Sequence, residues 1–266
     1  MTQTTRDSKA AADGELAQLR AEIERLDENL LGALEARLAL VERVGAAKRA
    51  AGAAQPFRPQ RERARLDAIA RASQARGLAP AAALAIWREM MGAALARQAR
   101  VQLVAPPALS AWARAQFGHS LPCAPAAPHE ALTRAAHDPL ALAVLPLAEE
   151  GGAPWWTQPL PTPVTIVAAL PFWSDGDGRI AALCAAQPIA EEEVFPVWRI
   201  AHAPEESEAV GAAGDALCLA RARTAALLAL PPDVPLPRDG RVLGAVLPPL
   251  HLKPGGDTAP PPQAQT

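Results

Sequence analysis

The sequence is poor in residues that build covalent or metal-held frameworks. It contains three cysteines in 266 residues, Cys123, Cys184 and Cys218, which lie far apart and without CxxC spacing. A disulfide framework or a zinc site is therefore not expected, and a reducing cytoplasm is the default compartment. The five histidines are scattered, and no pair has metal-ligand spacing on a predictable helix. We interpret them as structural or solvent-facing and predict no metal.

The sequence also lacks segments that would direct it to a membrane. Its N-terminus, MTQTTRDSKAAADGE, has no apolar core of a secretory signal. No uncharged apolar run reaches the ~20 residues that a membrane span needs. The net charge of −2 gives no reason to expect a nucleic-acid partner. We therefore predict a cytoplasmic protein with neither a membrane nor a nucleic-acid partner.

Charge is divided unevenly along the chain. Residues 1–104 carry 17 Lys+Arg against 12 Asp+Glu, whereas the remainder carries 9 against 16. A basic front half joined to an acidic rear half favours two domains, the first of them suited to an anionic ligand.

Apolar residues near the N-terminus recur in steps of three and four, the spacing of one helix face. They are Leu16, Leu19, Ile23, Leu26, Leu30, Leu34, Leu38, Val41 and Val44. The run from Glu15 to Ala50 contains no Pro and predicts one helix roughly 50 Å long. So long a helix is unusual in a small monomeric domain and needs a partner along its length. A loop (50–59), a short helix (61–77) and a third helix (78–104) are predicted to follow.

After residue 104 the sequence changes to short apolar runs separated by Pro, Gly and acidic residues. The runs are Leu140–Leu147, Val164–Leu170, Ile180–Leu183, Leu217–Ala220 and Val242–Leu247. They predict an α/β domain over 105–253. The composition predicts disorder over 1–13 and in a tail over 254–266. The predicted fold class is α+β overall, with an all-α three-helix domain over 14–104 followed by the α/β domain.

Polar residues interrupt the apolar spacing of the first helix. Arg37 and Lys48 are eleven residues apart, which brings them within about 20° on one face, so both can address one anionic ligand. Arg20 lies roughly 42 Å from Lys48 along the helix. To bind the same ligand, Arg20 must come from a second subunit running antiparallel. This geometry predicts an intertwined homodimer with two equivalent shared sites.

Three segments in succession resemble the all-helical chorismate mutases, which occur alone or fused to prephenate dehydratase. The segments are LAQLRAEIERLDENLLGALEARLALVERVGAAKRA, RPQRER and IWREMMGAALARQ. The resemblance implies an isomerase that converts chorismate to prephenate in the shikimate pathway, toward phenylalanine and tyrosine. The rearrangement is intramolecular and needs no cofactor. The enzyme must hold a dianion in its folded conformer and stabilise charge on the ether oxygen.

The resemblance also implies roles for individual residues of the first helix. Arg20 matches an arginine that the partner chain contributes to one carboxylate, and Arg37 matches the same-chain arginine for the other. A planar guanidinium suits this bidentate contact better than lysine would. Lys48 matches a donor to the ether oxygen, and Asp27 matches an orienting position.

The other two helices would complete the pocket. Gln98 matches the second donor to the ether oxygen. Glu62 matches the carboxylate that accepts from the ring hydroxyl, with Arg61 beside it. The sequence departs from the family at the pocket rim, where Arg58 replaces an Asp and Ala94 replaces a Ser. These departures bear on substrate affinity more than on the type of reaction.

Simpler and rival interpretations stay open. Any single charge could be merely solvated, and the run Arg58, Arg61, Arg63 and Arg65 could form a nucleic-acid patch, although the interleaved Glu62 argues against it. An isochorismate pyruvate-lyase would use similar cations. A non-catalytic helical dimerisation module with a ligand-sensing C-terminal domain is the rival that Arg58 and Ala94 favour.

Two rear segments, DPLALAVLPLAEEGGAPWW and VTIVAALPFW, resemble strands and a Pro-containing turn of a prephenate dehydratase domain. The Thr-Arg-Phe signature and the Ser/Thr-rich effector motifs are absent, so dehydratase activity is not expected. A degenerate relative of that domain and an unrelated α/β module remain the two alternatives.

Overall fold

A computed structural model describes residues 3–50, 52, 56–148, 153–174, 179–189, 197–204, 217–248 and 250–251. The predicted tail over 254–266 lies outside these residues. The chain forms two compact units, Met1–Ala51 and Gly52–Thr266. No described helix is long and apolar enough to cross a membrane.

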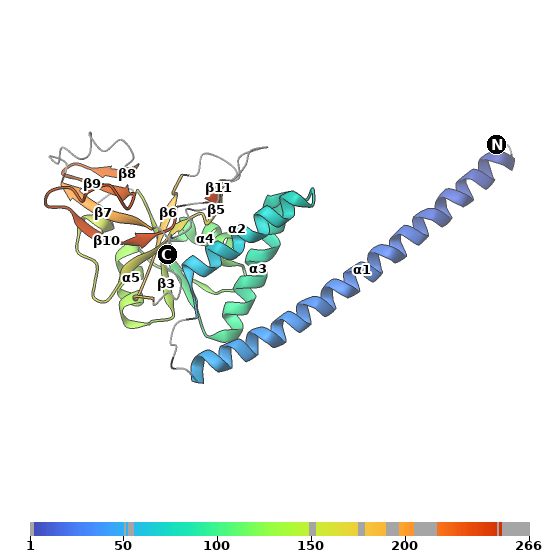
Figure 1. The fold of residues 1–266 in the computed structure, drawn as a ribbon, viewed down its shortest axis with the longest axis horizontal. Helices are drawn as coiled ribbons and strands as arrows, with labels where there is room; N and C mark the ends of the chain where they lie inside the picture. Colours follow the sequence, from blue (N-terminus) through green and yellow to red (C-terminus); the bar gives the residue numbers. More distant parts are fainter. Residues whose placement is uncertain are drawn as a thin grey trace, which may run out of the picture. The chain divides into compact units, whose positions relative to one another are not determined.

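The first unit contains a single unbroken helix, α1 (Gln3–Ala50), of 48 residues. At 1.5 Å per residue it is about 72 Å long (Figure 1, blue). It begins upstream of the predicted start at Glu15, within the segment 1–13 for which disorder is predicted. Alanines at 10–12 favour a helix there, because alanine has the highest helix propensity.

The apolar side chains of α1 remain exposed within this unit. Exposed fractions run from 37% at Leu34 to 62% at Leu30, and Leu16, Leu19, Ile23 and Leu26 lie between these values. The sequence predicts that these positions are core. The first unit holds no second element to cover them, which leaves α1 with a long apolar face.

The second unit begins with two helices, α2 (Pro59–Ala75) and α3 (Pro80–Gln98). Each has a proline in its first turn, where the missing N–H costs nothing. The predicted third helix ran on to residue 104, and this part of the prediction is wrong. Ala99 is already extended (φ −159°, ψ 167°), and strand β1 (Gln102–Ala105) follows. The β-branched Val101 and Val104 are compatible with a strand there, and the pairing of β1 with β2 and β3 selects the strand over a further turn of helix.

A nine-stranded sheet forms the centre of this unit. Its remaining strands are β2 (Cys123–Pro125), β3 (Ala141–Pro146), β4 (Thr165–Leu170), β6 (Ala182–Ala186), β7 (Trp198–Pro204), β8 (Leu217–Ala222), β9 (Ala225–Leu230) and β10 (Arg241–Val246). The order across the sheet is β2-β1-β3-β6-β4-β10-β7-β9-β8. β1 is parallel to β2 and β3, and β4 is parallel to β10, whereas the other neighbours are antiparallel. β5 (Trp173–Ser174) and β11 (Leu250–His251) form a separate parallel pair.

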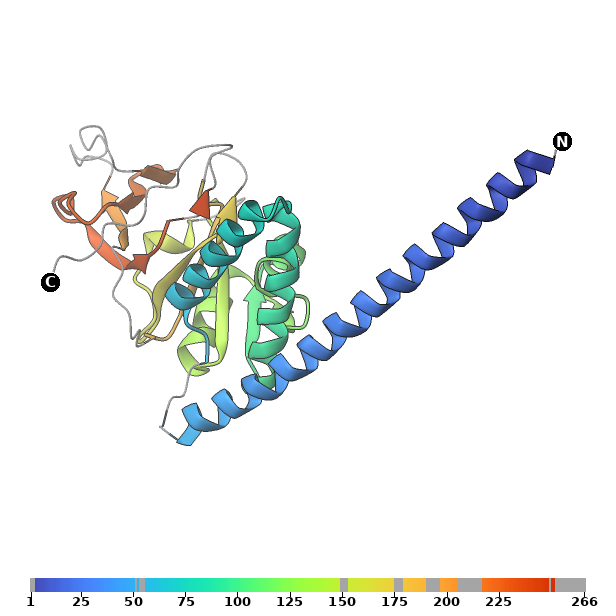
Figure 2. The same cartoon turned by 45° about the vertical axis from the view of Figure 1, so that its right-hand side comes forward.

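Helices cover the sheet on both faces. α4 (Pro107–Phe117) connects β1 to β2, and α5 (Pro128–His137) connects β2 to β3. Because these crossovers run in opposite directions along the order β2-β1-β3, right-handed connections place α4 and α5 on opposite faces. α2 and α3 lie side by side on the face that carries α4 (Figure 2).

A buried cluster joins α2 and α3 to the sheet. Leu66 of α2 and Leu84 and Leu95 of α3 share it with Leu103 of β1 and Leu142 of β3. Its hydrophobic contacts therefore cross residue 104, where the sequence predicts a domain boundary. That boundary stays a prediction about the family module, since it does not divide the described core.

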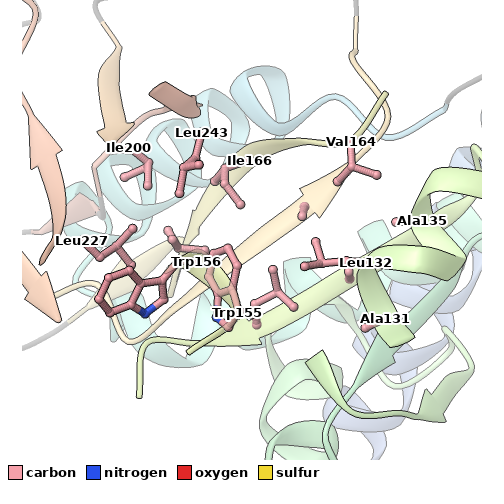
Figure 3. Close-up of a cluster of buried hydrophobic side chains, with 14 of the residues drawn as sticks. Ala131, Leu132, Ala135, Trp155, Trp156, Val164, Ile166, Ile200, Leu227 and Leu243 are labelled. Atoms are coloured by element: carbon pink, nitrogen blue, oxygen red, sulfur yellow. The ribbon is translucent and has the colours of Figure 1, made fainter. Parts of the chain in front are cut away.

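The second cluster lies on the opposite face, under α5. Trp155 and Trp156 form a short 3-10 helix (Trp155–Thr157) and are almost fully buried among Leu132, Ile166 and Leu227 (Figure 3). Their indole N–H groups donate to the carbonyl oxygens of Pro146 (2.7 Å) and Leu147 (3.1 Å). The 3-10 helix is thereby attached to the end of β3.

Candidate active site

The three cations predicted on the first helix all lie on α1. Arg20 follows Leu16 by four residues, and Lys48 follows Val44 by four. Arg37 follows Leu30 by seven. At 100° per residue, these spacings keep the cations within about 40° of the apolar face. Since α1 is unbroken, Arg20 and Lys48 are separated by about 42 Å along one straight element.

The first turn of α2 holds Arg58, Arg61 and Glu62 together. Arg58 caps the helix, and its carbonyl oxygen accepts from the Glu62 N–H at 2.9 Å. Glu62 is the acidic residue of the first turn, where the helix dipole favours negative charge. The Arg61 side chain is exposed, whereas Glu62 is half-buried.

The Glu62 carboxylate lies close to the sheet. Cys184 of β6 is fully buried, and burial raises the pKa of its thiol well above the usual value. The charge of Glu62 raises that pKa further.

The last two turns of α3 hold Ala94 and Gln98. Ala94 is 6% exposed, and Gln98 is half-buried with its Oε1 fully shielded from solvent. Gln98 follows Leu95 by three residues and so lies near the side of α3 that carries Leu84 and Leu95, the residues that contact the sheet cluster. The structure therefore joins Glu62, Ala94 and Gln98 to one packed unit. It assigns Arg20, Arg37 and Lys48 to the other unit, and each unit is described by itself.

Arg63 is a residue whose environment the sequence analysis missed. Its guanidinium donates to the carbonyl oxygen of Pro248, and burial lowers its pKa to about 10, an effect that Asp67 partly offsets. Arg63 also lines a small cavity with Gln60 of α2 and Phe172. The signal was present in the spacing, because Arg63 precedes the buried Leu66 by three residues and so shares the inward face of α2.

Among the described residues, no three His, Cys, Asp or Glu side chains come together in a way that could hold a metal ion. The candidate residues supply cationic side chains, one neutral amide and one carboxylate. Such a set can bind and orient an anion and donate hydrogen bonds to it.

Residues 19–99 match the family described as chorismate mutase type II. The match contains all eight candidate residues, from Arg20 to Gln98. No curated protein matches the chain. No solved structure matches it either.

Proposed function

We propose that this protein is a chorismate mutase that rearranges chorismate to prephenate in the cytoplasmic synthesis of phenylalanine and tyrosine. The observation that carries the proposal is the family match over residues 19–99. It is supported by cations carried on one continuous helix, at the spacing that a shared site requires.

The rearrangement requires the protein only to bind chorismate, orient it and stabilise its transition state. Within one molecule, the ether C–O bond breaks as a new C–C bond forms, so no nucleophile is consumed. Arg37 and the Arg20 of a second subunit hold the two carboxylates, which favours the folded conformer. Lys48 and Gln98 donate to the ether oxygen, where negative charge develops in the transition state.

The remaining residues shape the ring side of the pocket. Glu62 accepts from the ring hydroxyl, with Arg61 beside it and Asp27 in an orienting role. Arg58 and Ala94 lie at the rim, in place of a carboxylate and a hydroxyl. These two substitutions are expected to alter KM more than kcat, because they leave the two donors to the ether oxygen in place.

A homodimer follows from the apolar face of α1. Burying its leucines and isoleucine against a second copy stabilises each by about 1.5–3 kcal/mol. Two antiparallel copies bring Arg20 of one chain toward Lys48 of the other, and two-fold symmetry repeats this arrangement at a second site.

The rival function is a non-catalytic dimerisation module. The specific observation in its favour is the pair of altered rim residues, Arg58 and Ala94. In this case the sheet region would bind a regulator, and the helical region would only dimerise.

For residues 105–253 we propose a degenerate relative of a prephenate dehydratase domain, without dehydratase activity. β3 and β4 occupy the two segments that resemble that domain, and they belong to a sheet with parallel β1, β2 and β3. An unrelated α/β module is the alternative.

The decisive experiment incubates the purified full-length protein with chorismate and, separately, with isochorismate. Prephenate from chorismate supports the mutase, whereas pyruvate and salicylate from isochorismate indicate a lyase. Lys48→Ala is expected to lower kcat/KM by about 10²- to 10³-fold, because it removes a donor to the developing charge. Arg25→Ala, at an exposed position on the opposite side of α1, is the matched control and should retain activity. A folded dimer without turnover would leave the non-catalytic module as the function.

A further inference from the structure

The turn that follows α4 is hydrogen-bonded to the middle of α3. We name this turn, Phe117–Ser120, the α4 corner. The Glu89 carboxylate of α3 accepts from the backbone N–H of His119 (2.6 Å) and of Ser120 (3.0 Å) and from the Ser120 hydroxyl (2.6 Å). The His119 Nδ1 lies 3.3 Å from the same carboxylate. One side chain of α3 thus meets most of the polar groups of the corner.

One turn further along α3, the two backbones approach closely at a pair of glycines. A Cβ on Gly92 would lie 2.4 Å from the carbonyl oxygen of Phe117 and 2.9 Å from the Cα of Gly118. Gly118 has a φ of +98°, and a Cβ there would lie 2.9 Å from the Arg88 carbonyl oxygen. Neither position has room for a side chain, so the α4 corner and α3 are in close backbone contact at this point.

The same corner also contacts the beginning of α2. The Phe117 ring packs against Phe57, two residues before α2, with centroids 5.6 Å apart. Its other neighbour is Phe172, at 5.4 Å in an edge-to-face arrangement. Phe57 and Phe117 are almost fully buried. Phe117 therefore contacts both the residue that leads into α2 and the middle of α3.

We propose that the α4 corner positions the α2 and α3 side chains of the mutase site. Glu62 lies in the α2 turn that Phe57 precedes, and Gln98 ends the helix that Glu89 and Gly92 anchor. The inference rests on the proposed mutase function. It adds that residues beyond the family match of 19–99 set the geometry of the site. Donors to a transition state must be placed within about half an ångström, so a displaced α3 weakens catalysis while it leaves binding by the α1 cations largely intact.

Gly92→Ala in the full-length protein tests the proposal. Alanine is the better helix former, so a loss of activity cannot come from a weaker α3. The added methyl must push α3 away from the Phe117 carbonyl, and we expect kcat to fall about 10- to 100-fold while KM changes less than threefold. Gly32→Ala, at a helical glycine of α1 with nothing within 4 Å of the added Cβ, is the matched control.

Glu89 provides a second, gentler set of variants. Glu89→Ala removes every acceptor for the corner, whereas Glu89→Gln keeps one carbonyl oxygen and should restore part of kcat. Glu130→Ala breaks only the ion pair with Arg134 within α5 and should leave kcat unchanged. Amide hydrogen exchange at residues 94–98 gives a readout that does not depend on turnover, and we expect faster exchange in Gly92→Ala and Glu89→Ala.

The outcomes separate this inference from the proposed function. If the wild type converts chorismate and both Gly92→Ala and Glu89→Ala keep their kcat, the corner has no positioning role and the mutase assignment stands. If the wild type has no activity, the mutase assignment fails, and the proposed role of the corner in catalysis fails with it. In that event amide hydrogen exchange still tests whether the α4 corner holds α3. Unchanged protection at 94–98 in Gly92→Ala and Glu89→Ala would show that it does not.

Discussion

Opposing effects act on the carboxyl group of Glu89. Partial burial raises its pKa, but the hydrogen bonds from the Ser120 hydroxyl and from the His119 and Ser120 N–H groups outweigh burial and lower the pKa below its ordinary value of 4.5. Hydrogen bonds to the charged form favour ionisation. Because the folded-state pKa lies below the unfolded one, ionised Glu89 stabilises the fold above pH 4.5, and this stabilisation is lost as the pH falls through the folded-state pKa.

This sign gives a prediction for the free energy of unfolding. At pH 7 the wild type should exceed Glu89→Gln by about 1 kcal/mol, a modest value because the side chain is 44% exposed. The difference should shrink toward zero as the pH falls below 4.5. Urea unfolding of both proteins between pH 3 and pH 7 measures it. A difference that stays constant over this range would mean that ionised Glu89 is not what holds the corner.

The type of residue also determined which positions of the candidate site could be predicted from the sequence. Arg20, Arg37 and Lys48 stood out because charge on an apolar helix face needs an explanation, and α1 carries them as the spacing predicts. Gly92 and Glu89 gave no such signal. Their partners lie about thirty residues away in the α4 corner, and no local pattern links a helical glycine to a distant carbonyl oxygen.

At the scale of elements, α1 is a helix that its own unit cannot bury. A solvent-exposed face with this many leucines is a strong reason for self-association. The interlocked arrangement that we propose requires each site to take Lys48 from one chain and Arg20 from the other. That requirement can be tested without a structure of the dimer.

Arg20→Ala and Lys48→Ala are each expected to abolish most mutase activity. Mixed in equal amounts and allowed to exchange subunits, they should recover about a quarter of wild-type activity, because half the dimers are mixed and each mixed dimer keeps one intact site. Steady-state turnover of chorismate after co-refolding measures the recovery. A mixture of Arg37→Ala and Lys48→Ala is the control and should stay inactive, since both residues come from the same chain. Recovery in the control, or none in the test pair, would contradict the shared site.

The elements themselves were predictable to the extent that their signals were local. Each of the five apolar runs after residue 104 contains or overlaps a strand, among them β3 at Ala141–Pro146 and β4 at Thr165–Leu170. The end of α3 was not found, because Ala99 to Val104 read equally well as a continued helix. What decides it is the pairing of β1 with β2 and β3, which comes from residues up to forty positions away.

At the scale of the whole molecule, the packing of α2 and α3 could not be read from their sequences. Their apolar spacing predicts an inward face but not what covers it, and the family resemblance implied only other helices. The structure places a sheet on that face, with Leu84 of α3 and Leu142 of β3 in one fully buried cluster. The sequence predicts a boundary at residue 104, but the hydrophobic core crosses it. We therefore expect the segments on the two sides of residue 104 to fold together.

Folding together has a measurable consequence for Leu84 and Leu142. Replacing either with alanine should lower the free energy of unfolding by about 2–5 kcal/mol, the cost of a cavity at a fully buried site. If residues 52–266 unfold as one unit, Leu142→Ala must reduce the protection of α3 amides as much as that of β3 amides. Native-state hydrogen exchange reports both, and Leu236→Ala, at a partly exposed site, should change neither. Loss of protection confined to the sheet would mean that α2 and α3 fold independently of it, and the α4 corner would then have no means of setting the mutase site.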